Sequence, residues 1–363
     1  MVEYKRNYGI DLLRIVSMLM VVYLHVLKSS NMLFDHLIVG AKHDVLWLTE
    51  MAAYCAVNSY ALISGYVGFG RRFKLSNILQ LWMEVVFYLL VICLIYKAIA
   101  PSSVTVRQMI TSFLPVLSNQ YWYFTAYFAM FFFTPFLNLA VEKLSFEKSS
   151  YMLLAFLMVF SLISTLGGFK NLSQDAVVVK SGYSPLWLMI MYYMGAYIKK
   201  YRIAEKTPRC FSVIGYVSCV LISFLFCRNG KYHLMKYNSP TMVLCGVALL
   251  LIFARMRFGR NASRIIMYFS SATFGVYLIH MQDNNFEKIG GFIQGFKQLS
   301  VLRLMPAIFG VVIMIWFVCS LTDIVRQKLF KLLRIKRLAE RMEVTLRRSA
   351  QHGVEIFKRR LAG

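Results

Sequence analysis

About ten long apolar runs constrain the fold of this chain more than any other feature. A helix needs about 20 mainly apolar residues to cross a hydrocarbon core of about 30 Å. A segment surrounded by lipid must also satisfy its own backbone hydrogen bonds, which favours helices. We therefore predict an all-α, polytopic integral membrane protein with about ten transmembrane helices. The predicted spans are residues 8–28, 45–67, 76–96, 121–141, 149–166, 185–198, 211–227, 241–254, 265–282 and 304–325.

Two segments follow from the distribution of these runs. Residues 1–325 form the predicted membrane domain, and residues 326–363 form a basic tail in which leucines alternate with cations at roughly helical spacing. We expect the tail to lie as an amphipathic helix on the cytoplasmic leaflet, with RNA binding as the alternative. The formal net charge is +25, but the cations gather in small clusters at span ends. This pattern favours membrane topology and contacts with anionic lipids, and we expect no nucleic-acid partner.

The basic residues also predict the orientation of the chain. Most of the 41 lysines and arginines lie in the segments that share a side with the two termini. By the positive-inside rule, both termini are expected in the cytoplasm of a multi-pass protein of the cell membrane. The first apolar run has the length of a span and no small-residue cleavage site, so we expect it to be retained. The seven cysteines lack metal-ligand spacing, and we expect packing roles and no metal.

The first span carries three ionisable residues, and such groups at membrane depth indicate a functional site. Asp11 precedes Arg14 by three residues, so the two side chains share a helical face. They are either a structural ion pair or a unit in which Asp11 orients the planar fork of Arg14 toward a phosphate or carboxylate. His25 follows Arg14 by eleven residues and returns to nearly the same face. Its imidazole is suited to accept and return a proton near neutral pH, unless it is simply a buried, satisfied histidine.

The second span ends in SGYVGFGRRFK, with Arg71 and Arg72 at the predicted cytoplasmic boundary. Topology alone accounts for arginines there, and the functional alternative is an anionic group that arrives from the cytoplasm. The glycine spacing does not match a nucleotide-binding fingerprint.

Four further residues are candidates for contact with a substrate. Glu84 in the third span needs a polar partner, either His25 or an arginine. Trp122 and Tyr123 begin the aromatic fourth span and form either an interfacial belt or a stacking surface for a sugar ring. His280 is a second histidine at depth, near the outer end of the ninth span.

Four motifs follow one another along the chain and together cover about residues 6–325. They are Asp11 and Arg14 with His25, Ser64 and Gly65 followed by Arg71 and Arg72, Trp122 and Tyr123 opening a span that ends in TPFLN, and the segment YLIH at residues 277–280. In these motifs the chain resembles the membrane-bound acyltransferase family 3.

The resemblance implies about ten helices and the transfer of acyl groups, commonly acetyl from acetyl-CoA, to hydroxyls of cell-surface carbohydrates. It implies that Arg14 and His25 are the family's essential pair and that Arg71 and Arg72 lie on the donor side. Acyl-CoA would be a co-substrate, and no tightly bound cofactor is expected. The chain is similar to the stand-alone type without a fused periplasmic domain, which leaves direct acylation and relay through a polysaccharide-assembly partner both open.

One competing function is a transporter or flippase of a lipid-linked glycan or small anion. Such proteins often have two related halves with interrupted helices at matching positions. The sequence has no such pairing. What the resemblance implies is therefore an O-acyltransferase of the membrane with a carbohydrate acceptor.

Overall fold

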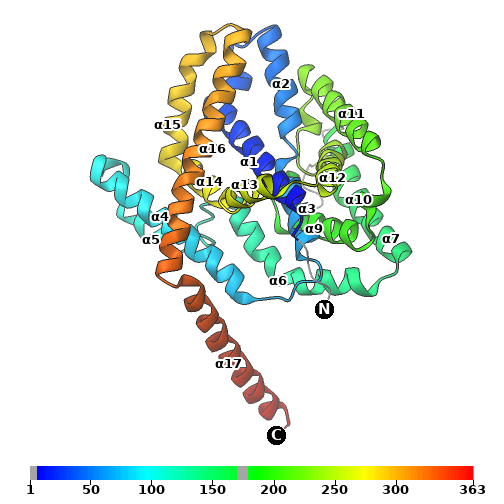
Figure 1. The fold of residues 1–363 in the computed structure, drawn as a ribbon, viewed down its shortest axis with the longest axis vertical. Coiled ribbons are helices and arrows are strands. Elements are labelled where there is room, and N and C mark those ends of the chain that lie inside the picture. Colours follow the sequence, from blue (N-terminus) through cyan, green and yellow to red (C-terminus); the bar gives the residue numbers. More distant parts are fainter. Residues whose placement is uncertain (1–5, 170–178, 363) are drawn as a thin grey trace. The chain divides into compact units, whose positions relative to one another are not determined.

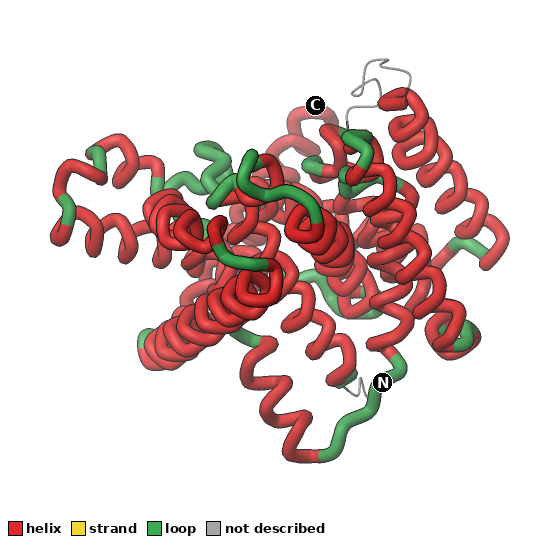
Figure 2. The backbone as a smooth tube through the Cα atoms, turned by 90° about the horizontal axis from the view of Figure 1, so that it is seen from above, coloured by secondary structure: helices red, strands yellow, loops and turns green. Residues whose placement is uncertain are grey.

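The computed structural model describes residues 6–169 and 179–362. In these ranges the regular structure is entirely helical, and no strand is present (Figures 1 and 2). Seven of the described helical segments are long and apolar enough to cross a membrane. The predicted all-α membrane fold is confirmed.

Each of the seven segments coincides with a span predicted from the sequence. Two are built from consecutive helices, and the others are single helices. The single helices are α1 (Tyr8–Ser29), α4 (Leu75–Ile99), α6 (Trp122–Lys143), α11 (Arg209–Arg228) and α16 (Val301–Leu332). The segment Phe146–Gly167 consists of α7 (Phe146–Leu157), a π-helical stretch (Met158–Ile163) and the start of α8 (Ser164–Phe169). The segment Arg260–His280 consists of α13 (Arg260–Ser270) and α14 (Thr273–His280).

The other three predicted spans are also helical but are broken or short. The predicted span 45–67 is interrupted at Tyr54 and Cys55, between α2 (Ala41–Ala53) and α3 (Ala56–Gly68). The helices α9 (Pro185–Lys200) and α12 (Pro240–Ala254) have 16 and 15 residues. Both begin with a capping serine followed by proline, a start signal that fixes their first turn.

Short elements connect these segments. They are the helices α5 (Val106–Thr111), α10 (Ile203–Lys206) and α15 (Asp283–Gln294) and the 3₁₀ turns Met32–Phe34, Pro101–Ser103, Lys180–Gly182, Tyr232–Leu234 and Gly295–Gln298.

The residues from 326 onward, predicted as a helical tail, form the end of α16 and the helix α17 (Ile335–Ala362). The contact of this tail with lipid stays a prediction.

The chain divides into two compact units. The first comprises Met1–Arg71 and Tyr121–Ser320, and the second comprises Arg72–Gln120 and Leu321–Gly363. In the second unit α17 packs against α4, where the Glu343 carboxylate accepts a hydrogen bond of 2.9 Å from the Ser76 backbone N–H. Burial raises the pKa of Glu343, but hydrogen bonds from Ser76 and Arg347 outweigh burial and hold the pKa at about 2.

In the first unit α1 is the central helix. It is buried along most of its length and packs against α2, α3, α12, α13, α14 and α15. The pair α3 and α9 packs closely because glycines face the opposite backbone. A Cβ at Gly65 would lie 1.8 Å from the Tyr192 carbonyl oxygen, and a Cβ at Gly195 would lie 2.0 Å from the Leu62 carbonyl oxygen. Small residues that permit such backbone approach are typical of helix contacts in membranes.

Replacing Gly65 with valine should therefore push α3 and α9 apart. We expect the free energy of unfolding to fall by about 1–3 kcal/mol, the usual effect of overpacking. Thermal unfolding of the protein in detergent, followed by tryptophan fluorescence, measures the change. Gly215→Val is the matched control, because nothing lies within 4 Å of a Cβ at that position. Equal unfolding midpoints for the two variants would show that the close approach is not required.

Candidate active site

The N-terminal end of α1 is shaped by its cap. The Asn7 side-chain oxygen accepts hydrogen bonds from the backbone N–H groups of Gly9 and Ile10. This cap starts the helix at Tyr8 and places Asp11 in the first turn, where a carboxylate is favoured by the helix dipole. Arg14 follows one turn further along.

Asp11 lies between two arginines. One of its carboxylate oxygens accepts a hydrogen bond from Arg6 Nε, and the other accepts a hydrogen bond of 2.8 Å from an Arg14 guanidinium nitrogen. The Asp11 side chain is 4% exposed, whereas that of Arg14 is 28% exposed. The contact between Asp11 and Arg14 expected from their spacing is present. One carboxylate serves two cations here, so the cluster keeps an excess of positive charge.

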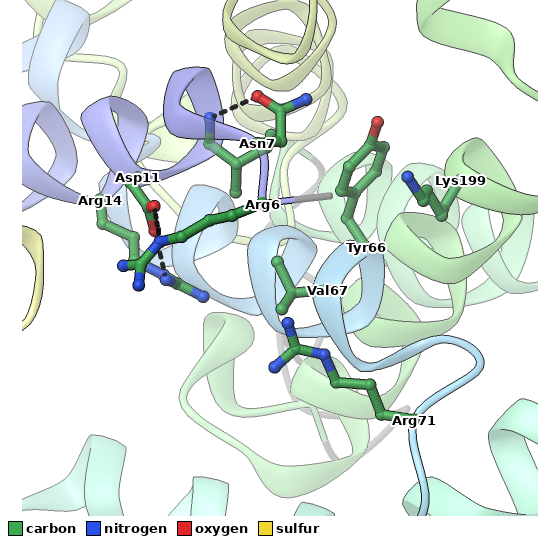
Figure 3. A pocket seen from close by; sticks show the side chains of 9 residues that line it. Arg6, Asn7, Asp11, Arg14, Tyr66, Val67, Arg71 and Lys199 are labelled. Atoms are coloured by element: carbon green, nitrogen blue, oxygen red, sulfur yellow. Dashed lines mark hydrogen bonds and ion pairs between the residues drawn. The ribbon is translucent and has the colours of Figure 1, made fainter. Parts of the chain in front are cut away.

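This cluster opens into a pocket of about 240 Å³ (Figure 3). Arg6 reaches it from the segment before α1, and Arg14 reaches it from the second turn of α1. Arg71 enters from the segment after α3, and Lys199 comes from the end of α9. Four cationic groups thus surround a space that holds one carboxylate, and such a concentration of like charge attracts anions. The other lining residues are Asn7, Ile10, Asp11, Tyr66 and Val67.

A second pocket, of about 320 Å³, adjoins the first and shares Tyr66 and Lys199 with it. The Lys199 ammonium lies 4.8 Å from the centre of the Tyr66 ring. Arg202 forms an ion pair with Glu205 on the rim, and its hydrogen bond lowers the pKa of Glu205. Lys199 therefore contributes its charge to both spaces.

The other end of α1 carries His25. Its Nδ1 lies 2.9 Å from Nε2 of His280, at the end of α14. The rings of Tyr277 and Phe286 lie within 6.5 Å and 6.3 Å of the His25 ring. The eleven residues from Arg14 correspond to a rise of about 16 Å. The structure thus brings together two histidines that the sequence offered as separate candidates.

Trp122 and Tyr123, at the start of α6, lie in two aromatic groups of the first unit. The centre of the Trp122 ring lies 4.5 Å from the centre of the Tyr183 ring and 6.0 Å from the centre of the Tyr237 ring, on which it stacks. Tyr123 lies 6.4 Å from the Tyr277 ring, which in turn neighbours both histidines. Tyr123 is therefore joined to the histidine pair through Tyr277, and contact of either residue with a sugar stays a prediction.

The second unit holds the two remaining predicted site residues, Glu84 and Arg72. Glu84 accepts a hydrogen bond of 2.8 Å from Arg326, which also binds Asp323. Of the two partners expected for Glu84, the structure shows an arginine, and the contacts are those of a buried ion-pair network. Arg72 is exposed and is not one of the residues that line the cationic pocket. Substrate contacts of both residues stay predictions.

Arg6, Tyr66 and Lys199 are among the lining residues that were not predicted as site residues from the sequence. Arg6 and Lys199 were interpreted only as topology signals. Arg6 precedes the helix, so no helical spacing relates it to Asp11. Lys199 comes from a distant helix, and only the packing of α9 on α3 brings it to Tyr66. The cluster of basic residues at span ends was a signal for both, but it does not distinguish a pocket from a membrane boundary.

These features define a helical membrane protein with an anion-attracting pocket and a histidine pair at opposite ends of one span. The model of acyltransferase family 3, described as an acyltransferase domain, matches residues 7–323. The chain belongs to this family and is a membrane acyltransferase. The resemblance found in the motifs is confirmed over nearly the same range. No curated protein and no solved structure matched the chain.

Proposed function

We propose that the protein transfers an acyl group, most simply acetyl, from acyl-CoA to a hydroxyl of a cell-surface or lipid-linked carbohydrate. The observation that carries this proposal is the pocket with four cationic groups in a member of an acyltransferase family. The head of CoA bears several phosphates, and arginine binds phosphate through paired, charge-assisted hydrogen bonds. The pocket offers three arginines and one lysine for this purpose.

The side of the membrane from which the donor would enter follows from the position of the pocket. The pocket lies at the N-terminal end of α1, and the positive-inside distribution favours cytoplasmic termini. Acyl-CoA would therefore enter from the cytoplasm, with its head at the pocket. Its thin arm would run along the face of α1 from Arg14 toward His25. The plasma membrane is the membrane in which such a donor and a surface glycan meet.

The chemistry assigned to His25 is general-base catalysis. The imidazole takes the proton of the acceptor hydroxyl while that oxygen attacks the thioester carbonyl carbon. A C–O bond forms, the C–S bond breaks, and the departing CoA thiolate takes the proton back from the imidazolium. Positioning of both substrates supplies a further part of the rate.

The acceptor would approach from the end of the helices where the aromatic residues lie. Trp122 and Tyr123 lie in aromatic groups that would supply a ring face for stacking on a sugar. Transfer to this sugar is either direct or completed by a separate polysaccharide-assembly protein. Membrane lipids surround the helices in both cases.

Release of CoA by the purified protein tests the proposal. The protein in lipid nanodiscs is given acetyl-CoA with and without a glycan extract, and free thiol is measured. Acceptor-dependent CoA release, with a mass increase of the glycan by one acyl group, supports the enzyme. The same protein in sealed vesicles provides the second measurement. A glycan moved across the vesicle membrane without release of CoA would support the transporter and overturn the proposal.

Replacing Arg71 with glutamine should raise the KM for acyl-CoA about tenfold, with little change in kcat. The expected loss is close to the lower end of a charge-assisted hydrogen bond, about 1.5 kcal/mol, because Arg71 is exposed. Arg72→Gln is the matched comparison, since Arg72 is not a lining residue of the pocket. Initial rates at varied acyl-CoA measure both variants. An Arg72→Gln effect equal to that of Arg71→Gln would contradict the assignment of the donor site to the pocket alone.

A further inference from the structure

The histidine pair has a geometry that fixes where its protons lie. His25 Nδ1 and His280 Nε2 are 2.9 Å apart, and the ring centres are 5.2 Å apart. The second nitrogen of His280, Nδ1, lies 2.5 Å from the backbone carbonyl oxygen of Val276. His280 is 2% exposed, so it has little access to water.

The Val276 carbonyl decides the tautomer of His280. A carbonyl oxygen only accepts hydrogen bonds, so Nδ1 of His280 carries a proton. In a neutral ring Nε2 is then an acceptor, and it accepts a hydrogen bond from the N–H group of His25 Nδ1. A second proton on His280 would make a buried cation. The described polar contacts of the His280 ring are His25 and the Val276 carbonyl, and neither is a carboxylate. Of the four ring nitrogens, His25 Nε2 is therefore the one whose lone pair can accept a further proton.

The end of α14 that carries His280 is itself held in place. The Tyr121 hydroxyl donates a hydrogen bond of 2.8 Å to the Leu278 carbonyl oxygen. The Asn285 side-chain amide donates a hydrogen bond of 2.7 Å to the Ile279 carbonyl oxygen. With the bond from His280 to Val276, three side-chain donors hold backbone carbonyls in the last turns of α14. The His280 ring is thereby preorganised toward α1.

We propose that His280 is a positioning residue that holds His25 in the tautomer with a bare Nε2, so that Nε2 is the atom that accepts the proton of the acceptor hydroxyl. This inference rests on the proposed function, in which His25 is the base. The burial of His280 behind His25 favours this role over the direct substrate contact expected from its sequence motif.

The proposed arrangement also provides a hydrogen-bond acceptor for the positively charged, protonated form of His25. When His25 Nε2 takes the proton, His25 Nδ1 keeps its own proton and still donates to His280 Nε2. The imidazolium thus retains a hydrogen-bond acceptor without any movement of α1 or α14. An oriented partner of this kind is the general way in which a catalytic histidine is kept in the productive tautomer.

Three variants of His280 separate positioning from packing. The oxygen of a glutamine reaches about as far as Nε2 and can accept the hydrogen bond from His25, whereas asparagine reaches only as far as Nδ1, and leucine offers no polar atom. We expect His280→Gln to keep kcat within about tenfold of the natural protein. His280→Asn and His280→Leu should lose about 10²-fold in kcat, the lower range for a misplaced general base, with KM for acyl-CoA unchanged. Equal activity of all three variants, or a glutamine variant as slow as the leucine variant, would overturn the proposal.

A spectroscopic measurement tests the tautomer without any acyl transfer. The chain has six histidines, and the His25 signals in ¹⁵N-histidine solid-state NMR are identified by their loss in His25→Ala. We expect His25 protonated at Nδ1 in the natural protein and in His280→Gln, and the other tautomer in part or in full in His280→Leu. His25 protonated only at Nε2 in the natural protein would overturn the proposal. Absence of CoA release with the expected tautomer would instead count against the proposed function alone.

Discussion

Replacing His25 with alanine should lower kcat for acyl transfer about 10²–10⁴-fold, the range that a positioned general base contributes. The hydroxyl of a carbohydrate is a poor nucleophile until its proton is removed, and His25 is the proposed acceptor of that proton. His25 is separated from the cationic pocket by eleven residues of α1, so donor binding should persist. We therefore expect kcat to fall while the dissociation constant for acyl-CoA stays within about twofold. Single-turnover CoA release and equilibrium binding in nanodiscs measure the two quantities.

His36→Ala is the matched control for this variant. His36 lies on the exposed segment after α1, with a side chain that is 87% exposed. Its replacement should leave kcat, donor binding and thermal unfolding unchanged. Full activity of His25→Ala would remove His25 from the mechanism. A loss of activity accompanied by an equal loss of acyl-CoA binding would place His25 in the donor site instead.

The membrane fold was largely predictable because the bilayer imposes a simple rule on sequence. Every predicted span coincides with one helix or with consecutive helical elements, and the first helix, Tyr8–Ser29, begins where the apolar run begins. The break at Tyr54 and Cys55 was missed because no proline or glycine marks it. The division of the second apolar run depends on packing in the folded chain, which hydropathy does not describe.

The candidate site was predictable in part, for an equally physical reason. Asp11 and Arg14 lie on one helix, so their spacing alone predicts the contact that the structure contains. The pairing of His25 with His280 joins residues 255 positions apart. Lys199 is likewise brought to the pocket by contact between two helices, because Gly65 and Gly195 let α3 and α9 approach closely. Spacing in a sequence predicts contacts within one helix, and these contacts join different helices.

Arg14 should be the residue on which donor binding depends most. Its guanidinium is held by the Asp11 carboxylate, and its backbone carbonyl oxygen accepts a hydrogen bond of 2.7 Å from the Tyr60 hydroxyl. Both contacts fix the position of the fork before a ligand arrives. Asp11 keeps its second arginine, Arg6, when Arg14 is removed, so the carboxylate is not left without a cation. A neutral replacement of Arg14 should therefore fold and fail mainly in recognition of the donor.

We expect Arg14→Gln to raise the KM for acyl-CoA about 10–100-fold, which corresponds to about 1.5–3 kcal/mol for hydrogen bonds to a charged group. Arg14→Lys should lose less than Arg14→Gln but should not restore the natural KM, because an ammonium lacks the planar fork. Arg303→Gln, at an exposed position outside the pocket, is the control. Raised ionic strength should weaken donor binding most in the natural protein, since screening acts on the cations that the variant lacks. A fall in kcat with an unchanged KM would mean that Arg14 acts on the reacting groups, and the pocket would then need another occupant.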